Sequence, residues 1–203
     1  MSIECPPAIG LMHPDKVKRN SDARADDVLI LGKPLGVGIL SAVLKKGQLD
    51  QAGYAQMIEF TTRLNTPGVA LAELPGVHAL TDITGFGLAG HLLEICRGSR
   101  LAARIELDAL PVIGAALEWV KKGVATGASE RNWNGYGADV ALPAGAPDWV
   151  KKLVTDPQTS GGLLVACAPE DERRVLDAFA KEGFSEARRI GRLAEGPARV
   201  AVV

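Results

Sequence analysis

A buried strand is predicted to run directly into a glycine-rich turn and then a helix over residues 77–96, and this order constrains the fold most. The apolar run 77–80 leads to Asp82, and Gly85 and Gly87 then precede an apolar helical pattern. A carboxylate at a strand end can bind a metal ion, and free backbone amides at a helix start can bind an anion. Asp also caps helices, however, and glycines also ease tight packing. The spacing alone leaves both interpretations open.

The rest of the chain predicts short strands interspersed with helices. Further strands are expected at 28–31, 101–107, 162–168, 187–193 and 198–203, and helices at 36–44, 51–64, 66–75, 88–96, 113–122, 149–154 and 169–181. Residues 123–147 are rich in Gly, Ala, Asn and Pro and are expected to be mostly loop. Because hairpin strands occur beside strand–helix alternation, the pattern favours an α+β fold with helices packed on a mixed β-sheet.

Cap residues are expected to set several helix boundaries. Asp50 is a good N-cap for the helix that follows it, and Asn65 is expected to cap the short helix that contains Pro67. Gly98 is expected to end the helix after the glycine-rich turn.

Composition and charge argue against several classes of function. The net charge is −1, so there is no basic excess for nucleic acid. Cys5, Cys96 and Cys167 are far apart, which argues against a disulfide framework or a thiolate zinc site and favours a reducing compartment. There is no signal-peptide pattern, and no apolar run approaches the roughly 20 residues that span a bilayer. We therefore expect a cytoplasmic protein that binds neither nucleic acid nor membrane.

Three further segments have compositions that suit ligand binding. Residues 155–162 (Thr-Asp-Pro-Gln-Thr-Ser-Gly-Gly) are typical of an anion-binding nest but equally of an Asp-Pro turn. Lys33 lies in 32–38, which resembles a phosphate loop without its spacing, so the lysine faces either a phosphate or solvent. Residues 132–135 (Asn-Trp-Asn-Gly) either cover a ligand or anchor a loop. His91 is expected to be a buried, hydrogen-bonded histidine rather than a ligand.

Taken in this order, the motifs resemble those of selenophosphate synthetase (selenide, water dikinase). The matching segments are 33–36, Asn65, 81–91 and 156–162, and the resemblance extends over residues 13–203. The wider superfamily includes aminoimidazole ribonucleotide synthase, thiamine-monophosphate kinase and a hydrogenase-maturation protein. The extension Phe-Gly-Leu-x-Gly-His and the run 156–162 point to the selenophosphate branch.

The resemblance implies conversion of ATP, selenide and water into selenophosphate, AMP and phosphate, with Mg²⁺ as cofactor. It implies that Asp82 is a magnesium ligand. It also implies that the ATP phosphates lie against Thr84, Gly85, Gly87, Thr159, Ser160 and Gly161. Residues 27–203 would form the family's C-terminal α+β domain, and residues 1–26 the last part of its N-terminal ATP-binding and dimerisation domain. A homodimer is left open.

The sequence also departs from the family pattern. The family's reactive Cys or selenocysteine and its neighbouring Lys have no counterpart here, so no catalytic residue is assigned and this chain alone is expected to be inactive. Cys5 is in the wrong place, and no basic residue near it in sequence favours a thiolate. Two rival interpretations remain: a non-catalytic module that binds nucleotide or a partner, and a related ATP-dependent synthase of the same superfamily.

Overall fold

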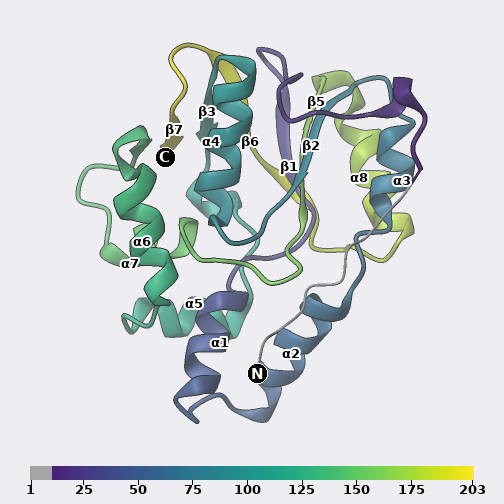
Figure 1. The fold of residues 1–203 in the computed structure, drawn as a ribbon. Coiled ribbons are helices and arrows are strands. Elements are labelled where there is room, and N and C mark those ends of the chain that lie inside the picture. Colours follow the sequence, from purple (N-terminus) through teal and green to yellow (C-terminus); the bar gives the residue numbers. More distant parts are fainter. Residues whose placement is uncertain (1–10) are drawn as a thin grey trace.

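A seven-stranded mixed sheet forms the centre of the computed structural model, which describes residues 11–203 (Figure 1). The strands are β1 (Val28–Leu31), β2 (Val77–Asp82), β3 (Leu101–Ile105), β4 (Val140–Ala141), β5 (Leu163–Cys167), β6 (Arg188–Glu195) and β7 (Val200–Val202). Their order is β2-β5-β1-β6-β3-β7-β4. The β3–β7 and β7–β4 pairs are parallel, and the other pairs are antiparallel.

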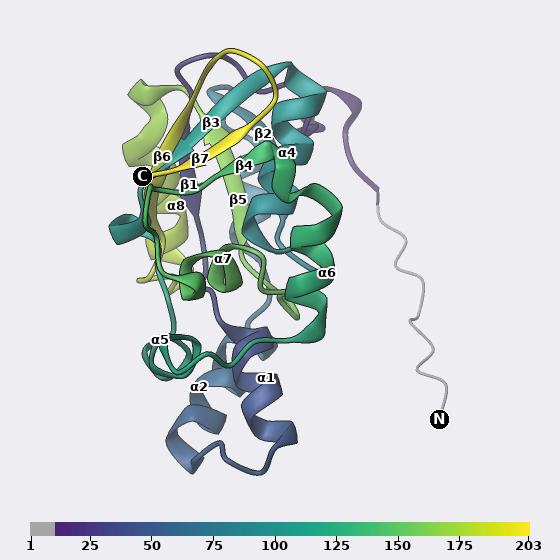
Figure 2. The same ribbon diagram turned by 90° about the vertical axis from the view of Figure 1, so that its left-hand side faces the viewer.

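Helices cover both faces of this sheet. The α-helices are α1 (Val37–Lys45), α2 (Gln51–Thr62), α3 (Pro67–Ala72), α4 (Gly87–Ser99), α5 (Gly114–Lys121), α6 (Gly127–Tyr136), α7 (Asp148–Val154) and α8 (Glu172–Lys181). Short 3₁₀ helices occur at Pro14–Lys16, Leu107–Ala109, Gly137–Asp139 and Pro169–Asp171. Figure 2 shows the sheet between α8 on one side and α4 and α6 on the other, with α1 and α2 beyond one end. The expected α+β fold with a mixed sheet is confirmed.

The strand β1 is buried on both faces, which explains its continuous apolar run. Val28 and Ile30 join a cluster beneath α3 and α8, whereas Leu29 and Leu31 join the larger cluster beneath α4, α5 and α7. A strand covered by helices on both sides needs apolar residues at every position rather than at alternate ones. Among residues 11–203, no helix has the combined length and apolarity that a bilayer crossing requires.

The main departure from the sequence-based expectation is α6, because residues 123–147 were expected to be mostly loop. Thr126 caps this helix by accepting a hydrogen bond from the Ser129 amide at 3.1 Å. Its glycines and asparagines are weak helix formers. Contacts made by Asn132 and Tyr136 with a distant turn, residues 84–87, hold it in place instead. Tertiary interactions therefore override a composition that is typical of a loop.

Smaller departures concern helix caps and strand pairing. Asp50 caps α2 as expected, through a 2.7 Å bond from the Gly53 amide. The short helix α3 has Thr66 rather than Asn65 at its N-cap. Gly98 lies inside α4, which ends instead at Arg100 in the left-handed conformation, with φ 58°. The closing strands β6 and β7 do not pair with each other, because β3 lies between them.

Candidate phosphate-binding site

Asp82 is the last residue of β2, where it lies opposite Leu163 of β5 at one end of the sheet. Its side chain is exposed, and it forms no hydrogen bond or ion pair with the described residues. The N-cap of α4 is Phe86, which makes no side-chain cap bond. Asp82 therefore does not cap this helix, and the capping alternative is wrong.

The turn from Thr84 to Gly87 is held through its carbonyl oxygens. The Thr84 oxygen accepts hydrogen bonds from the amides of Gln158 at 2.9 Å and Gly87 at 3.1 Å. The Gly85 oxygen accepts a 2.9 Å bond from Asn132 Nδ2, and the Phe86 oxygen accepts one from the Tyr136 hydroxyl. The turn is thus fixed by two other segments of the chain, α6 and the motif that contains Gln158.

The structure brings the two predicted motifs together at the end of β2 and the start of β5. The Ile83 amide donates to the Gly162 oxygen at 3.0 Å, next to the Gln158–Thr84 bond. Thr159 and Ser160 are exposed beside this junction, and Ser160 has a left-handed backbone with φ 50°. Two hydroxyl residues of the second motif are therefore exposed to solvent close to the turn.

Gly87 and Gly161 allow the motifs to approach each other. A Cβ at Gly87 would lie 2.7 Å from the Thr155 carbonyl carbon, and its φ of +69° also disfavours a side chain. A Cβ at Gly161 would lie 2.0 Å from the Ile83 oxygen. Gly85 differs, since a Cβ there would meet nothing within 4 Å. The space above Gly85 is open.

Asp156 and Gln158 do not face this open side but cap α1. The Gln158 Oε1 accepts bonds from the amides of Gly36 and Val37, both at 3.2 Å. Asp156 Oδ2 accepts the Ile39 amide at 3.2 Å and Gln158 Nε2 at 2.9 Å. Burial raises the pKa of Asp156 to about 7, although these hydrogen bonds act against the rise. This cap was not predicted from the sequence. Gly36 could have indicated it, because a glycine at the start of α1 has no side chain and the first amides of the helix then need acceptors from elsewhere.

Lys33 faces neither a phosphate nor solvent, so both expectations for it were wrong. Its side chain is buried, and Nζ donates to the backbone oxygens of Arg63 at 2.6 Å, Ser160 at 2.8 Å and Phe60 at 3.3 Å. Burial and, to a lesser extent, the Arg63 charge lower the pKa of Lys33 to about 8. Asn65 donates in the same way to the Gly161 oxygen at 2.9 Å. Lys33 and Asn65 together hold the backbone of the second motif through the oxygens of Ser160 and Gly161.

His91 lies behind the turn and is buried, as expected. Its Nε2 is 3.1 Å from Thr84 Oγ1, and its Nδ1 is 3.3 Å from Glu94 Oε2. The hydroxyl of Thr84 is thus oriented by an imidazole rather than left free to rotate.

The donor set for a metal ion is incomplete. Within residues 11–203, no group of three His, Cys, Asp or Glu side chains is placed to hold a metal. Magnesium binds through one or two carboxylates, with phosphate oxygens and waters as its other ligands. The exposed Asp82 carboxylate beside an open turn fits one such ligand, but it does not make a metal site alone.

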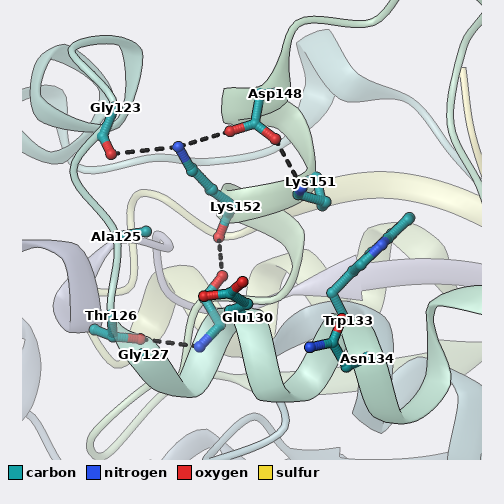
Figure 3. Close-up of a pocket in the computed structure, with 11 residues that line it drawn as sticks. Gly123, Ala125, Thr126, Gly127, Glu130, Trp133, Asn134, Asp148, Lys151 and Lys152 are labelled. Carbon is teal, nitrogen blue, oxygen red and sulfur yellow. Dashed lines mark hydrogen bonds and ion pairs between the residues drawn. The ribbon is translucent and has the colours of Figure 1, made fainter.

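A separate pocket of about 430 Å³ lies between α6 and α7 (Figure 3). Trp133 lines it, together with Lys151 and Lys152, which pair with Asp148 at 2.7 and 2.6 Å. These lysines are therefore partly neutralised, and the pocket contains none of the residues predicted to bind ATP or magnesium, although Trp133 and Asn134 of the segment 132–135 line it. Trp133 lies in α6 rather than in a loop, and it is partly buried against the larger core cluster.

Residues 24–203 match the family model described as "AIR synthase related protein, C-terminal domain". The chain belongs to this family. A selenide, water dikinase of Burkholderia ambifaria (strain MC40-6) is 60% identical over 195 residues, covering 96% of this chain and 55% of the relative. One of Rhizobium meliloti (strain 1021) is 49% identical over 195 residues, covering 96% and 56%. The resemblance to selenophosphate synthetase is confirmed, and this AIR synthase related domain spans about half the length of these relatives.

Solved structures agree on the fold. The hydrogenase maturation protein HypE superimposes with a TM-score of 0.66 at 19% identity, over 95% of this chain and 53% of that one. Thiamine-monophosphate kinase from Stenotrophomonas maltophilia K279a gives 0.64 at 21% identity, over 91% and 52%. At such identities the likeness establishes only the fold of this AIR synthase related domain.

Proposed function

We propose that this chain supplies the C-terminal side of the ATP phosphate site in a selenide, water dikinase, which makes selenophosphate from ATP, selenide and water. Relatives with that name, 49–60% identical over almost the whole chain, support the activity. The observation that carries the site is the contact between the two motifs, through the Ile83–Gly162 and Gln158–Thr84 bonds. This contact places an exposed carboxylate and two exposed hydroxyl residues around one open turn.

Each predicted residue has a role in this proposal. Asp82 is one magnesium ligand, and the bound ion would neutralise charge on the phosphates. Thr84, Gly85 and Gly87 form the turn that faces the phosphates, while the second motif lines the opposite side. Its contributing residues are Thr159, Ser160 and Gly161. Asp82 supplies only one ligand of the ion, so the proposal assigns the others to phosphate oxygens, waters and carboxylates that residues 11–203 do not bring together.

A fold relative supports the choice of ATP as the nucleotide. The hydrogenase maturation protein HypE, which has a TM-score of 0.66 at 18% identity, has been solved in complex with ATP. We propose the same ligand here and keep selenide as the second substrate on the strength of the named relatives.

The proposed domain division follows the family pattern. Residues 27–203 form the C-terminal α+β domain, and residues 1–26 belong to the end of an N-terminal ATP-binding domain. Cys5 lies outside the described residues. A homodimer, a cytoplasmic location and the inactivity of this chain alone stay predictions.

Calorimetric titration with MgATP tests the proposed site through Asp82→Ala. We expect the wild-type chain to bind MgATP and the variant to bind it about tenfold more weakly or worse, because a charge-assisted contact is lost. Asp108→Ala is the matched control, since Asp108 is an exposed aspartate in the 3₁₀ helix Leu107–Ala109, and it should bind like the wild type. Equal affinity of the two variants would contradict the role of Asp82. No binding by the wild type would favour the non-catalytic partner-binding module.

A further inference from the structure

Helix α6 reaches the predicted phosphate turn with two neutral donors. Asn132 Nδ2 donates to the Gly85 oxygen at 2.9 Å and also to the Thr155 oxygen at 3.0 Å, so it ties the turn to the end of α7. One helical turn later, the Tyr136 hydroxyl donates to the Phe86 oxygen. Burial raises the pKa of Tyr136, so its phenol keeps its proton and remains a donor.

These bonds determine where the amide hydrogens of the turn point. In a planar trans peptide, the C=O of one residue and the N–H of the next point in opposite directions. Because the Gln158 amide holds the Thr84 oxygen, the Gly85 N–H points away from Gln158. Because Asn132 holds the Gly85 oxygen, the Phe86 N–H points away from α6.

Both amide groups are available to a ligand. No described residue accepts a hydrogen bond from the amide of Gly85 or of Phe86. The space next to Gly85 is open, and Phe86 is 53% exposed. Successive free amides of this kind bind anions well, above all when they are fixed before the anion arrives.

We propose that Asn132 is a positioning residue that aims the Phe86 amide hydrogen at a phosphate oxygen of the nucleotide, beside the Gly85 amide that Gln158 orients. Tyr136 supports this arrangement, because it holds the next peptide, whose Gly87 N–H closes the turn on the Thr84 oxygen. This inference rests on the proposed function and extends it to α6. Asn132 has the larger role, because it makes two bonds and joins the turn to Thr155, whereas Tyr136 makes one. Both donors are already bonded to backbone oxygens, so they direct the turn and leave the phosphate to the amides.

Asn132→Ala tests this proposal, because it removes the donor without adding charge. Asn134→Ala is the matched control, since Asn134 lies on the same helix, is exposed and lines the separate pocket of Figure 3. We expect Asn132→Ala to weaken MgATP binding up to about tenfold, the upper end of the usual effect of losing one hydrogen bond, and Asn134→Ala to leave it unchanged. Tyr136→Phe deletes only the hydroxyl and should weaken binding less. It also provides a second test if Asn132→Ala does not fold.

Amide NMR spectra separate positioning from a merely structural role. On addition of MgATP to the ¹⁵N-labelled wild type, the amide resonances of Gly85 and Phe86 should shift downfield. In Asn132→Ala the Phe86 shift should shrink more than the Gly85 shift, because Asn132 holds the Gly85 oxygen whereas Gln158 still holds the Thr84 oxygen. MgATP binding without shifts at these two amides would overturn this inference and leave the proposed function intact. No MgATP binding by the wild type would overturn both.

Discussion

Gly85 and Gly87 lie two residues apart in the turn after β2, but their surroundings differ sharply. Gly87 has a left-handed backbone and packs against the Thr155 carbonyl, whereas Gly85 borders open space with no atom within 4 Å of an added Cβ. Only Gly87 is therefore needed for folding. The open space at Gly85 is why we propose that this residue faces the ligand.

The pair Gly87→Ala and Gly85→Ala tests this assignment at the residue scale. Gly87→Ala should lower the free energy of unfolding by about 2 kcal/mol or more, because it combines backbone strain with a steric clash. Gly85→Ala should change it by less than about 0.5 kcal/mol. Urea unfolding of both variants measures the difference, and equal losses would show that the packing around Gly87 is described wrongly.

Lys33 shows how far single residues could be predicted from the sequence. Its position at the end of a strand was predicted correctly, since the apolar run 28–31 ends there. Its contacts were not, because the three carbonyl oxygens that it binds belong to Phe60, Arg63 and Ser160, up to 127 positions away. A lysine without a nearby carboxylate looks solvent-exposed in the sequence, and only the tertiary fold supplies its acceptors.

At the scale of elements, α1 begins without a capping side chain of its own. Gly36 has no side chain to cap the helix. Instead, Gln158 and the buried Asp156, which belong to the second motif, accept hydrogen bonds from the first amides of α1. Burial of a carboxylate favours its protonated form. The pKa of Asp156 is raised from 3.8 to about 7, which makes the stability of this contact depend on pH.

Asp156→Asn should remove that pH dependence. Because the folded pKa lies above the unfolded one, the proton on Asp156 stabilises the fold fully below about pH 3.8, and this contribution is lost as the pH rises to about 7. The free energy of unfolding of the wild type, relative to the variant, should therefore fall across this range and stay level above it. Urea unfolding from acid to neutral pH measures the difference. A wild type that gains stability relative to Asp156→Asn as pH rises would contradict the prediction.

The helices α2 and α6 differ in how well they could be predicted from the sequence. α2 has a strong local signal, because Asp50 caps it at 2.7 Å from within its own segment. α6 has a cap at Thr126 too, but its glycines and asparagines mask the helix. Its bonds to Gly85 and Phe86 cross about fifty positions, so they are invisible before the fold is known.

In the whole molecule, the candidate site depends on strand order. Asp82 ends β2, Gly162 precedes β5 and Gly32 follows β1, and these three strands are neighbours in the antiparallel order β2-β5-β1. Antiparallel pairing brings the end of β2, the start of β5 and the end of β1 to one end of the sheet. This order does not follow the sequence, so residue patterns alone left the two glycine motifs separate. The family resemblance, rather than spacing, joined them.

If the ATP phosphates bind between the two motifs, amide NMR mapping of MgATP binding will show it. Titration of the ¹⁵N-labelled chain should shift amides at 82–87 and 159–161, because both segments line the same open turn. Amides around the separate α6–α7 pocket, at Trp133, Lys151 and Lys152, should stay in place. Shifts that cluster at that pocket and spare the two motifs would contradict the account.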